Sequence, residues 1–78
     1  MAEVSHITKD YFGLTLYISP RGRPEKVYAC RAVTWKPTRG GGLNVVVQCW
    51  PGYGHYRGQV RLNRKQRAEF FKTMEIQV

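Results

Sequence analysis

Residues 27–50 of this chain read VYACRAVTWKPTRGGGLNVVVQCW, two runs of β-branched and aromatic residues joined by a segment rich in glycine. Apolar and polar residues alternate in each run, a period that is typical of strands with one buried face. A symmetric loop between the runs sets Cys30 opposite Cys49 on the inner face of a hairpin. The same parity turns Arg31 outward, whereas the opposite parity would bury this arginine without a partner. We therefore predict an antiparallel hairpin with this register, which a β-bulge in either strand would disrupt.

Two further segments show the same alternation, one on each side of this hairpin. The predicted strands cover residues 11–18, 27–35, 43–50 and 56–62. Turns rich in glycine and proline separate them, as in a meander. A first loop centred on Gly22 sets Leu16 opposite Tyr28, so one parity satisfies both hairpins. The candidate positions for short additional edge strands are Val4 and Ile7 at one end and Ile76 and Val78 at the other.

The segment after the last predicted strand begins a helix. Asn63 is a typical N-cap residue, and Gln66, three positions later, completes a capping box. The predicted helix covers residues 64–74. Its apolar stripe consists of Ala68, Phe71 and Met74, with Phe70 alongside. The fold class that follows is α+β: a four-stranded antiparallel meander, with curling toward a small barrel as a variant, and one C-terminal helix packed on one face.

Length and charge limit the functions open to this chain. Its 78 residues form a single small basic domain, residues 1–78, since a domain of this size buries only about 60% of its unfolded surface. Multidomain enzymes and dinucleotide-binding folds are therefore excluded. The 13 Lys and Arg residues against 5 Asp and Glu residues give a net charge of +8. A hydrophobic content of 42% is ordinary for a folded domain, so this charge does not indicate a disordered tail.

The sequence predicts no metal, no cofactor and no membrane segment. Cys30 and Cys49 lack the CxxC spacing of a structural zinc site, and we expect them to be reduced and to face the core. The longest apolar run, residues 45–47, is too short to span a bilayer. Met1 is followed by Ala-Glu-Val rather than by a secretion signal. We therefore expect a soluble, cytoplasmic protein.

Basic and aromatic side chains alternate on the outer face of the predicted sheet. Guanidinium groups neutralise phosphates and aromatic rings stack on exposed bases, so such a face suits nucleic acid. In a meander the first and third loops lie at the same end of the sheet, which brings Arg21 and Arg23 near His55. We predict that the protein binds nucleic acid, duplex DNA in preference to RNA. The candidate nucleic-acid-binding residues are Arg21, Gly22, Arg23, Lys26, Arg31, Trp50, Tyr53, His55, Arg57 and Arg61.

A short motif in the first loop, residues 20–24, reads PRGRP. It resembles the core of the AT-hook, a DNA-binding element built on Arg-Gly-Arg-Pro. The resemblance implies that Arg21 and Arg23 lie in an AT-rich minor groove, while Gly22 permits close backbone approach. It covers five of the 78 residues, and Glu25 follows where a basic residue is common in the family. The same string is also an adequate turn.

A second function class remains open, that of a small inhibitor of the phage or mobile-element type. Such a protein would bind an acidic or apolar patch on a host protein. Two tryptophans and two valines on one face make a larger apolar patch than most monomers expose, and a homodimer would also cover it. The candidate protein-interface residues are Trp35, Val46 and Trp50.

A third reading is a small basic ribonuclease toxin. His55 would act as acid or base in it. The phosphate would be held by Tyr53, Arg57 and Arg23. No catalytic residues are assigned, since the carboxylates are scattered and no Ser/His/Asp or Cys/His arrangement is legible. We predict that the protein is not an enzyme.

Overall fold

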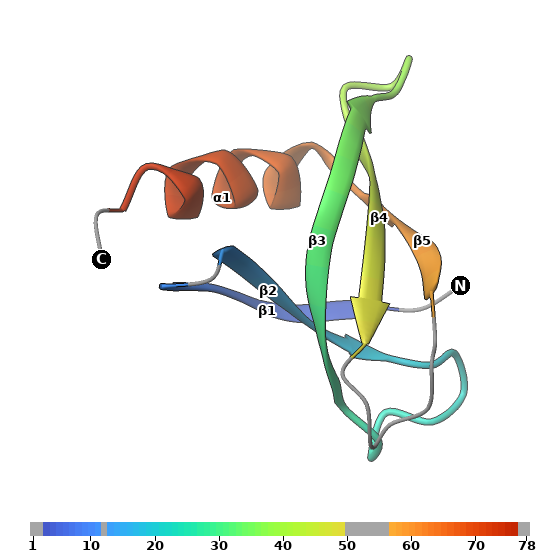
Figure 1. Cartoon of the computed structure of the whole chain (residues 1–78). Helices are drawn as coiled ribbons and strands as arrows, with labels where there is room; N and C mark the ends of the chain where they lie inside the picture. Colours follow the sequence, from blue (N-terminus) through green and yellow to red (C-terminus); the bar gives the residue numbers. More distant parts are fainter. Residues whose placement is uncertain (1–2, 12, 50–56, 77–78) are drawn as a thin grey trace.

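The structure of the protein is a computed structural model that describes residues 3–11, 13–49 and 57–76. Within these residues, five strands form one antiparallel sheet in the order β1-β2-β3-β4-β5, and one helix, α1, follows the last strand (Figure 1). The elements are β1 (Glu3–Asp10), β2 (Gly13–Ser19), β3 (Tyr28–Pro37), β4 (Leu43–Cys49), β5 (Arg57–Leu62) and α1 (Arg64–Met74). The predicted antiparallel meander with a C-terminal helix is confirmed, with one strand more than expected.

The additional strand is β1, which pairs with β2. A register shift between Val4 and His6 marks a β-bulge. The bulge brings Val4 and Ile7 to the same inner face although they are three positions apart, an odd spacing that regular alternation forbids. Period-two alternation is therefore lost here, and the sequence indicates only isolated edge-strand positions. At the other end, Ile76 lies outside any strand, and Val78 lies outside the described residues.

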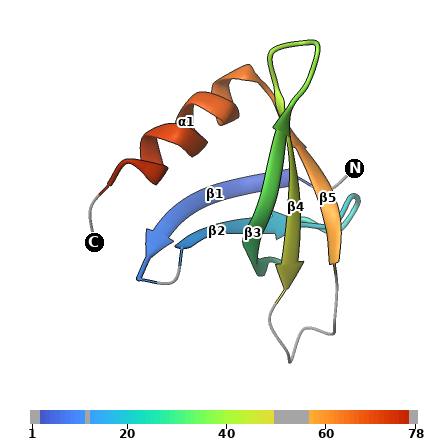
Figure 2. The same ribbon diagram turned by 45° about the horizontal axis from the view of Figure 1, so that its top comes forward.

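The sheet bends sharply between β2 and β3. The β1–β2 hairpin crosses β3, β4 and β5 at a steep angle in both ribbon views (Figures 1 and 2). Helix α1 lies on the concave side, where it contacts β1, β2 and β5. The convex side of β3, β4 and β5 therefore has no covering element among the described residues.

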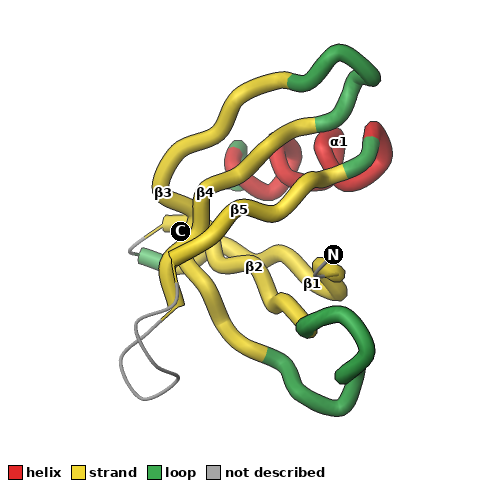
Figure 3. Tube along the Cα trace, turned by 90° about the vertical axis from the view of Figure 1, so that its right-hand side faces the viewer, coloured by secondary structure: helices red, strands yellow, loops and turns green. Residues whose placement is uncertain are grey.

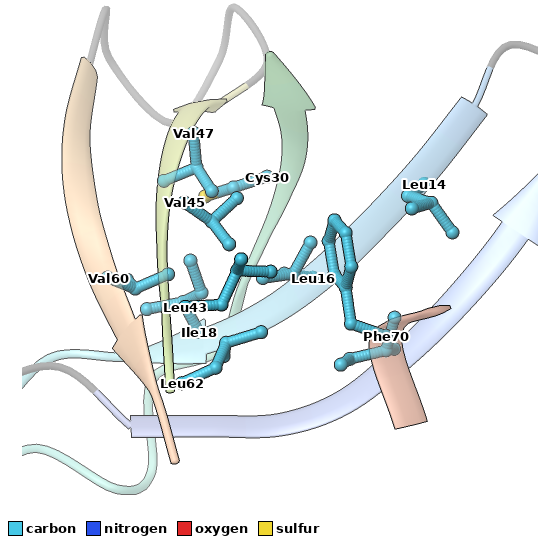
Figure 4. Packing of buried hydrophobic residues seen from close by; sticks show 11 residues of the cluster. Leu14, Leu16, Ile18, Cys30, Leu43, Val45, Val47, Val60, Leu62 and Phe70 are labelled. Atoms are coloured by element: carbon cyan, nitrogen blue, oxygen red, sulfur yellow. The ribbon is translucent and has the colours of Figure 1, made fainter. Parts of the chain in front are cut away.

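The concave side holds one apolar core to which every element contributes (Figure 4). Its buried members are Ile7, Leu14, Leu16, Ile18, Cys30, Leu43, Val45, Val47, Val60, Leu62 and Phe70. Phe70 is the largest of the fully buried side chains. Burial of a side chain of this kind contributes about 1.5–3 kcal/mol to folding. The attachment of α1 to the sheet therefore depends strongly on this one ring.

Helix α1 begins at the predicted residue. The Asn63 side chain accepts a hydrogen bond from the Gln66 amide at 2.8 Å, and the Gln66 side chain accepts one from the Asn63 amide at 3.0 Å. The predicted capping box is thus confirmed. Phe70 and Thr73 are the buried residues of the helix, whereas Ala68 is exposed. Its prediction as a core residue is wrong, because Ala68 lies about 200° from Phe70 around the helix axis.

The two hairpins keep the predicted parity. Cys30 lies opposite Cys49 in the β3–β4 hairpin, as expected. In the β2–β3 hairpin Leu16 lies opposite Cys30 and not opposite Tyr28. The connecting loop is therefore centred one residue later than predicted. This moves the register by two residues, an even number that leaves the inner face unchanged.

The cysteine pair departs from the expected redox state. Cys30 is disulfide-bonded, and its register partner Cys49 is the other of the two cysteines in the chain. Facing residues in an antiparallel ladder have Cα atoms about 4.5–5.5 Å apart, within the range of a disulfide. The expectation of reduced thiols rested on the absence of a secretion signal and is wrong for this structure.

Lys9 connects β1 to the end of α1. Its Nζ donates hydrogen bonds to the carbonyl oxygens of Met74 and Ile76, each at 2.6 Å. A cation is favourable at this end, because the helix dipole is negative there. At the start of the helix, Gln66 Nε2 donates to the carbonyl oxygen of Val4 at 3.3 Å. β1 is therefore bonded to both ends of α1.

We expect Lys9→Met to lower the free energy of unfolding by about 1–2 kcal/mol, because it removes charge-assisted hydrogen bonds to the helix end. Urea unfolding followed by circular dichroism measures this loss. Lys72→Met is the matched control, since it removes the same charge from an exposed side chain in the last turn of α1. We expect a change below about 0.5 kcal/mol for the control. Equal losses in the two variants would contradict the role assigned to Lys9.

Candidate functional site

A β-bulge in β3 decides which side chains face outward. The register shifts between Ala32 and Thr34, so Trp35 lies opposite Val45, whose side chain is fully buried. The Trp35 ring packs edge-to-face on Phe70, with 5.1 Å between ring centroids. The prediction that Trp35 shares the outer face with Val46 is therefore wrong. An extra residue reverses the alternation for the rest of the strand.

The outer face of β3, β4 and β5 consists of three rows of facing residues. Lys36, Asn44 and Arg61 form one row, because Asn44 of β4 lies opposite Lys36 of β3 and opposite Arg61 of β5. We define the basic sheet face as Arg31, Thr34, Lys36, Asn44, Val46, Gln48, Gln59 and Arg61. The backbone of Arg57 continues the row of Gln48. Helix α1 packs on the opposite side of these strands (Figure 2).

The basic sheet face is polar across its width. Thr34, Gln48 and Gln59 are exposed, and Asn44 is half-buried. Amide side chains both donate and accept hydrogen bonds, and the hydroxyl group does the same. Val46 lies half-buried at the centre. The face therefore offers hydrogen-bonding groups between cations rather than an apolar patch.

Arg31 occupies the predicted outer position but is partly engaged. Its Nη2 lies 3.9 Å from Oδ1 of Asp10, and the Arg31 side chain is 25% exposed. The carboxylate of Asp10 offsets part of the positive charge at this corner of the face. Of Arg31 and Arg61, the predicted binding residues whose side chains the structure describes on the strands, Arg61 is exposed.

The PRGRP motif forms two consecutive turns between β2 and β3. Arg23 N donates to Pro20 O at 3.0 Å, and Lys26 N donates to Arg23 O at 3.1 Å. Gly22 has φ +80°, the left-handed conformation that the third residue of a type II turn requires. The side chains of Arg21, Arg23 and Lys26 are exposed. The glycine thus has a structural role in the turn, and the arginines remain available to a ligand.

The predicted cluster at the end of the sheet falls partly beyond the described chain. Trp50, Tyr53 and His55 lie outside the described residues. The predicted meeting of the first and third loops depends on them. The structure instead places Arg21 in the lining of the same groove as the connection between β3 and β4, on the other side of its opening, which sequence reasoning did not expect.

A groove of about 860 Å³ lies where β1 and β5, the two edges of the sheet, approach each other. We call it the seam groove. It is lined by Glu3, Val4, Arg21, Thr38, Arg39, Gly40, Gly42, Arg61, Leu62, Asn63, Arg64 and Gln66. Four of these residues are arginines and one is a glutamate. Sequence reasoning missed the groove, because it requires β1 and the bend of the sheet.

The described residues contain no group of three or more His, Cys, Asp or Glu side chains placed to hold a metal ion. No helix among them has the length and apolar character needed to cross a bilayer. No family model, curated protein or solved structure matches the chain.

The inward position of Trp35 leads to a prediction on stability. Its side chain is 37% exposed, so we expect Trp35→Ala to lower the free energy of unfolding by about 2 kcal/mol, less than the loss of a fully buried ring. Val46→Ala, in the neighbouring register pair on the outer face, is the control and should cost less than about 1 kcal/mol. Chemical unfolding of both variants measures the difference. A larger loss for Val46→Ala would contradict the bulge.

Proposed function

We propose that this protein binds duplex DNA through the basic sheet face. The observation that carries the proposal is a sheet surface that no described element covers, with cations at its margin. Lys36 and Arg61 frame a row of the face, with Asn44 between them in the ladder. Phosphate contacts supply affinity, and amide side chains hydrogen-bond to base edges or phosphates.

The net charge supports an anionic partner of some length. Eight positive charges in excess on 78 residues repel one another, which disfavours the compact state. A nucleic-acid backbone relieves that repulsion and releases its own condensed counterions. Exposed Lys36 and Arg61 place part of this charge on the basic sheet face.

A duplex fits the face better than a single strand does. Proteins that bind single-stranded DNA or RNA stack the bases on aromatic rings. The described residues of the basic sheet face include no aromatic ring, because Trp35 packs on Phe70 beneath the sheet. Hydrogen-bonding side chains between cations suit the edges and backbone of a paired helix.

The described residues favour the alternative of a host-protein inhibitor less than they favour nucleic-acid binding. That reading depends on an exposed apolar patch made by Trp35, Val46 and Trp50. Trp35 lies on the inner side of the sheet, and Trp50 lies outside the described residues. Val46 is half-buried and Val33 is 42% exposed, and two valines alone do not make a hydrophobic interface core.

We expect the affinity for duplex DNA to fall steeply with salt, with a log-log slope of about −3 to −5, because three to six phosphate contacts release counterions. Fluorescence anisotropy of a labelled duplex at several salt concentrations measures the slope. The double substitution Lys36→Gln with Arg61→Gln should reduce its magnitude by about 2.

The control for this prediction is Lys65→Gln with Lys72→Gln. Both lysines are exposed on α1, on the other side of the sheet. The control removes the same charge and should leave the slope within about 0.5 of the original. A flat salt response of the unmodified protein would reject DNA binding. Equal reductions in both double variants would reject the sheet face as the contact surface.

A further inference from the structure

The seam groove exists because the curled sheet stops short of closing into a barrel. β1 and β5 are the unpaired edges of the sheet, and the first residues of β1 approach β5. The β3–β4 loop and the start of α1 border the opening on one side, and the β2–β3 loop lies on the other (Figure 3). Gln66 and Val4 both line the groove, and their hydrogen bond joins the start of α1 to β1 there.

The arginines of the groove have no acidic partner in the described part of the chain. Among the described residues, Arg31 forms an ion pair with Asp10, and neither residue lines the groove. No arginine of the groove forms an ion pair with a described carboxylate. Glu3 contributes the one negative charge of the lining. Four guanidinium groups against one carboxylate leave a strongly positive channel, where mutual repulsion is uncompensated.

The β3–β4 loop contacts Arg64, one of the groove arginines. Gly42 N donates to Thr38 Oγ1 at 3.1 Å, and Thr38 N donates to Gly42 O at 3.1 Å. At Gly41, a Cβ would stand 2.9 Å from Arg64 Nε, so the guanidinium group lies directly on this glycine. The loop also holds Arg67, whose Nη1 donates to Gly41 O at 3.4 Å. The glycines thus permit close contact of arginine with the loop backbone.

Arg61 makes the groove continuous with the basic sheet face. It lies opposite Asn44 on the outer face of β5 and also lines the groove. The cations of the sheet face, Lys36 and Arg61, are therefore continuous with the groove arginines, among them Arg64 and Arg21. An extended polyanion with regularly spaced charges matches this path, whereas a single small anion would meet only part of it.

We infer that the seam groove binds the sugar–phosphate backbone of the same nucleic acid that lies on the basic sheet face. This inference rests on the proposed function and deepens it by separating two kinds of contact. The sheet face carries the amide groups that can reach bases. The groove carries arginines whose planar forks bind phosphate bidentately. Arg21 then acts with the groove and apart from its neighbour Arg23.

The test compares two matched pairs of substitutions. Arg21→Gln with Arg64→Gln removes two charges from the groove, and Arg23→Gln with Lys26→Gln removes two from the exposed turn beside it. Anisotropy is measured with AT-rich and GC-rich duplexes between about 50 and 200 mM salt. Circular dichroism and thermal unfolding verify that each variant is folded.

We expect the groove pair to reduce the magnitude of the salt slope by about 2, equally on both duplexes, because phosphate contacts are independent of sequence. The turn pair should change the slope by less than about 0.5. Equal reductions for both pairs would overturn the inference, as would a loss confined to AT-rich DNA. That last result would favour minor-groove insertion of Arg21 and Arg23.

Two outcomes separate this inference from the proposed function. If the unmodified protein binds duplex DNA but the groove pair leaves the slope unchanged, the inference fails and the proposed function stands. If the unmodified protein shows no salt-dependent binding, both fail. Poly-glutamate at matched charge serves as a competitor. If it displaces the duplex as well as unlabelled duplex does, the groove recognises acidic protein, and the inference is overturned.

Discussion

The β-bulge in β3 determines which side chains meet on the two sides of the sheet. Before the bulge Cys30 faces the apolar core, and after it Trp35 faces the same side of the sheet, with its ring packed edge-to-face on Phe70. Regular alternation would place Trp35 outside and bring Thr34 into the core, next to the helix. The same shift sets Thr34 opposite Val46 on the outer face. An aromatic contact beneath the sheet and a polar surface above it therefore depend on one additional residue.

The start of α1 combines good capping with unfavourable charge. The Asn63–Gln66 capping box satisfies backbone groups there, yet the first turn has no acidic residue and includes Arg64 and Lys65. Cations at this end oppose the helix dipole. Arg64 additionally faces the other arginines of the seam groove. The caps and the bonds to β1 offset this repulsion, so stability is maintained by backbone contacts while the side chains stay available to an anion.

Local chemistry predicts much of this fold from the sequence, and the two bulges account for most of the differences. The Asn63 cap and the glycine-rich turn before β4 have signatures in composition, and both elements begin where expected. The bulges in β1 and β3 have none, since Ser5 and Val33 are ordinary strand residues. When the bulges are not foreseen, the sequence of β1 shows no regular alternation and Trp35 is assigned to the wrong face. The seam groove could not be predicted, because it joins residues from the first strand, two loops and the helix.

The unpaired edges of the sheet bear on how copies of the protein approach one another. Edge strands expose backbone groups that can extend the ladder into a second chain, and bulges and charges hinder this. β1 has a bulge, and β5 carries Arg61 beside the other groove arginines. The positive charge of Arg61 opposes the pairing of two β5 edges. A bound polyanion that neutralises Arg61 removes this repulsion, and the exposed backbone of β5 is then less protected against pairing with a second copy.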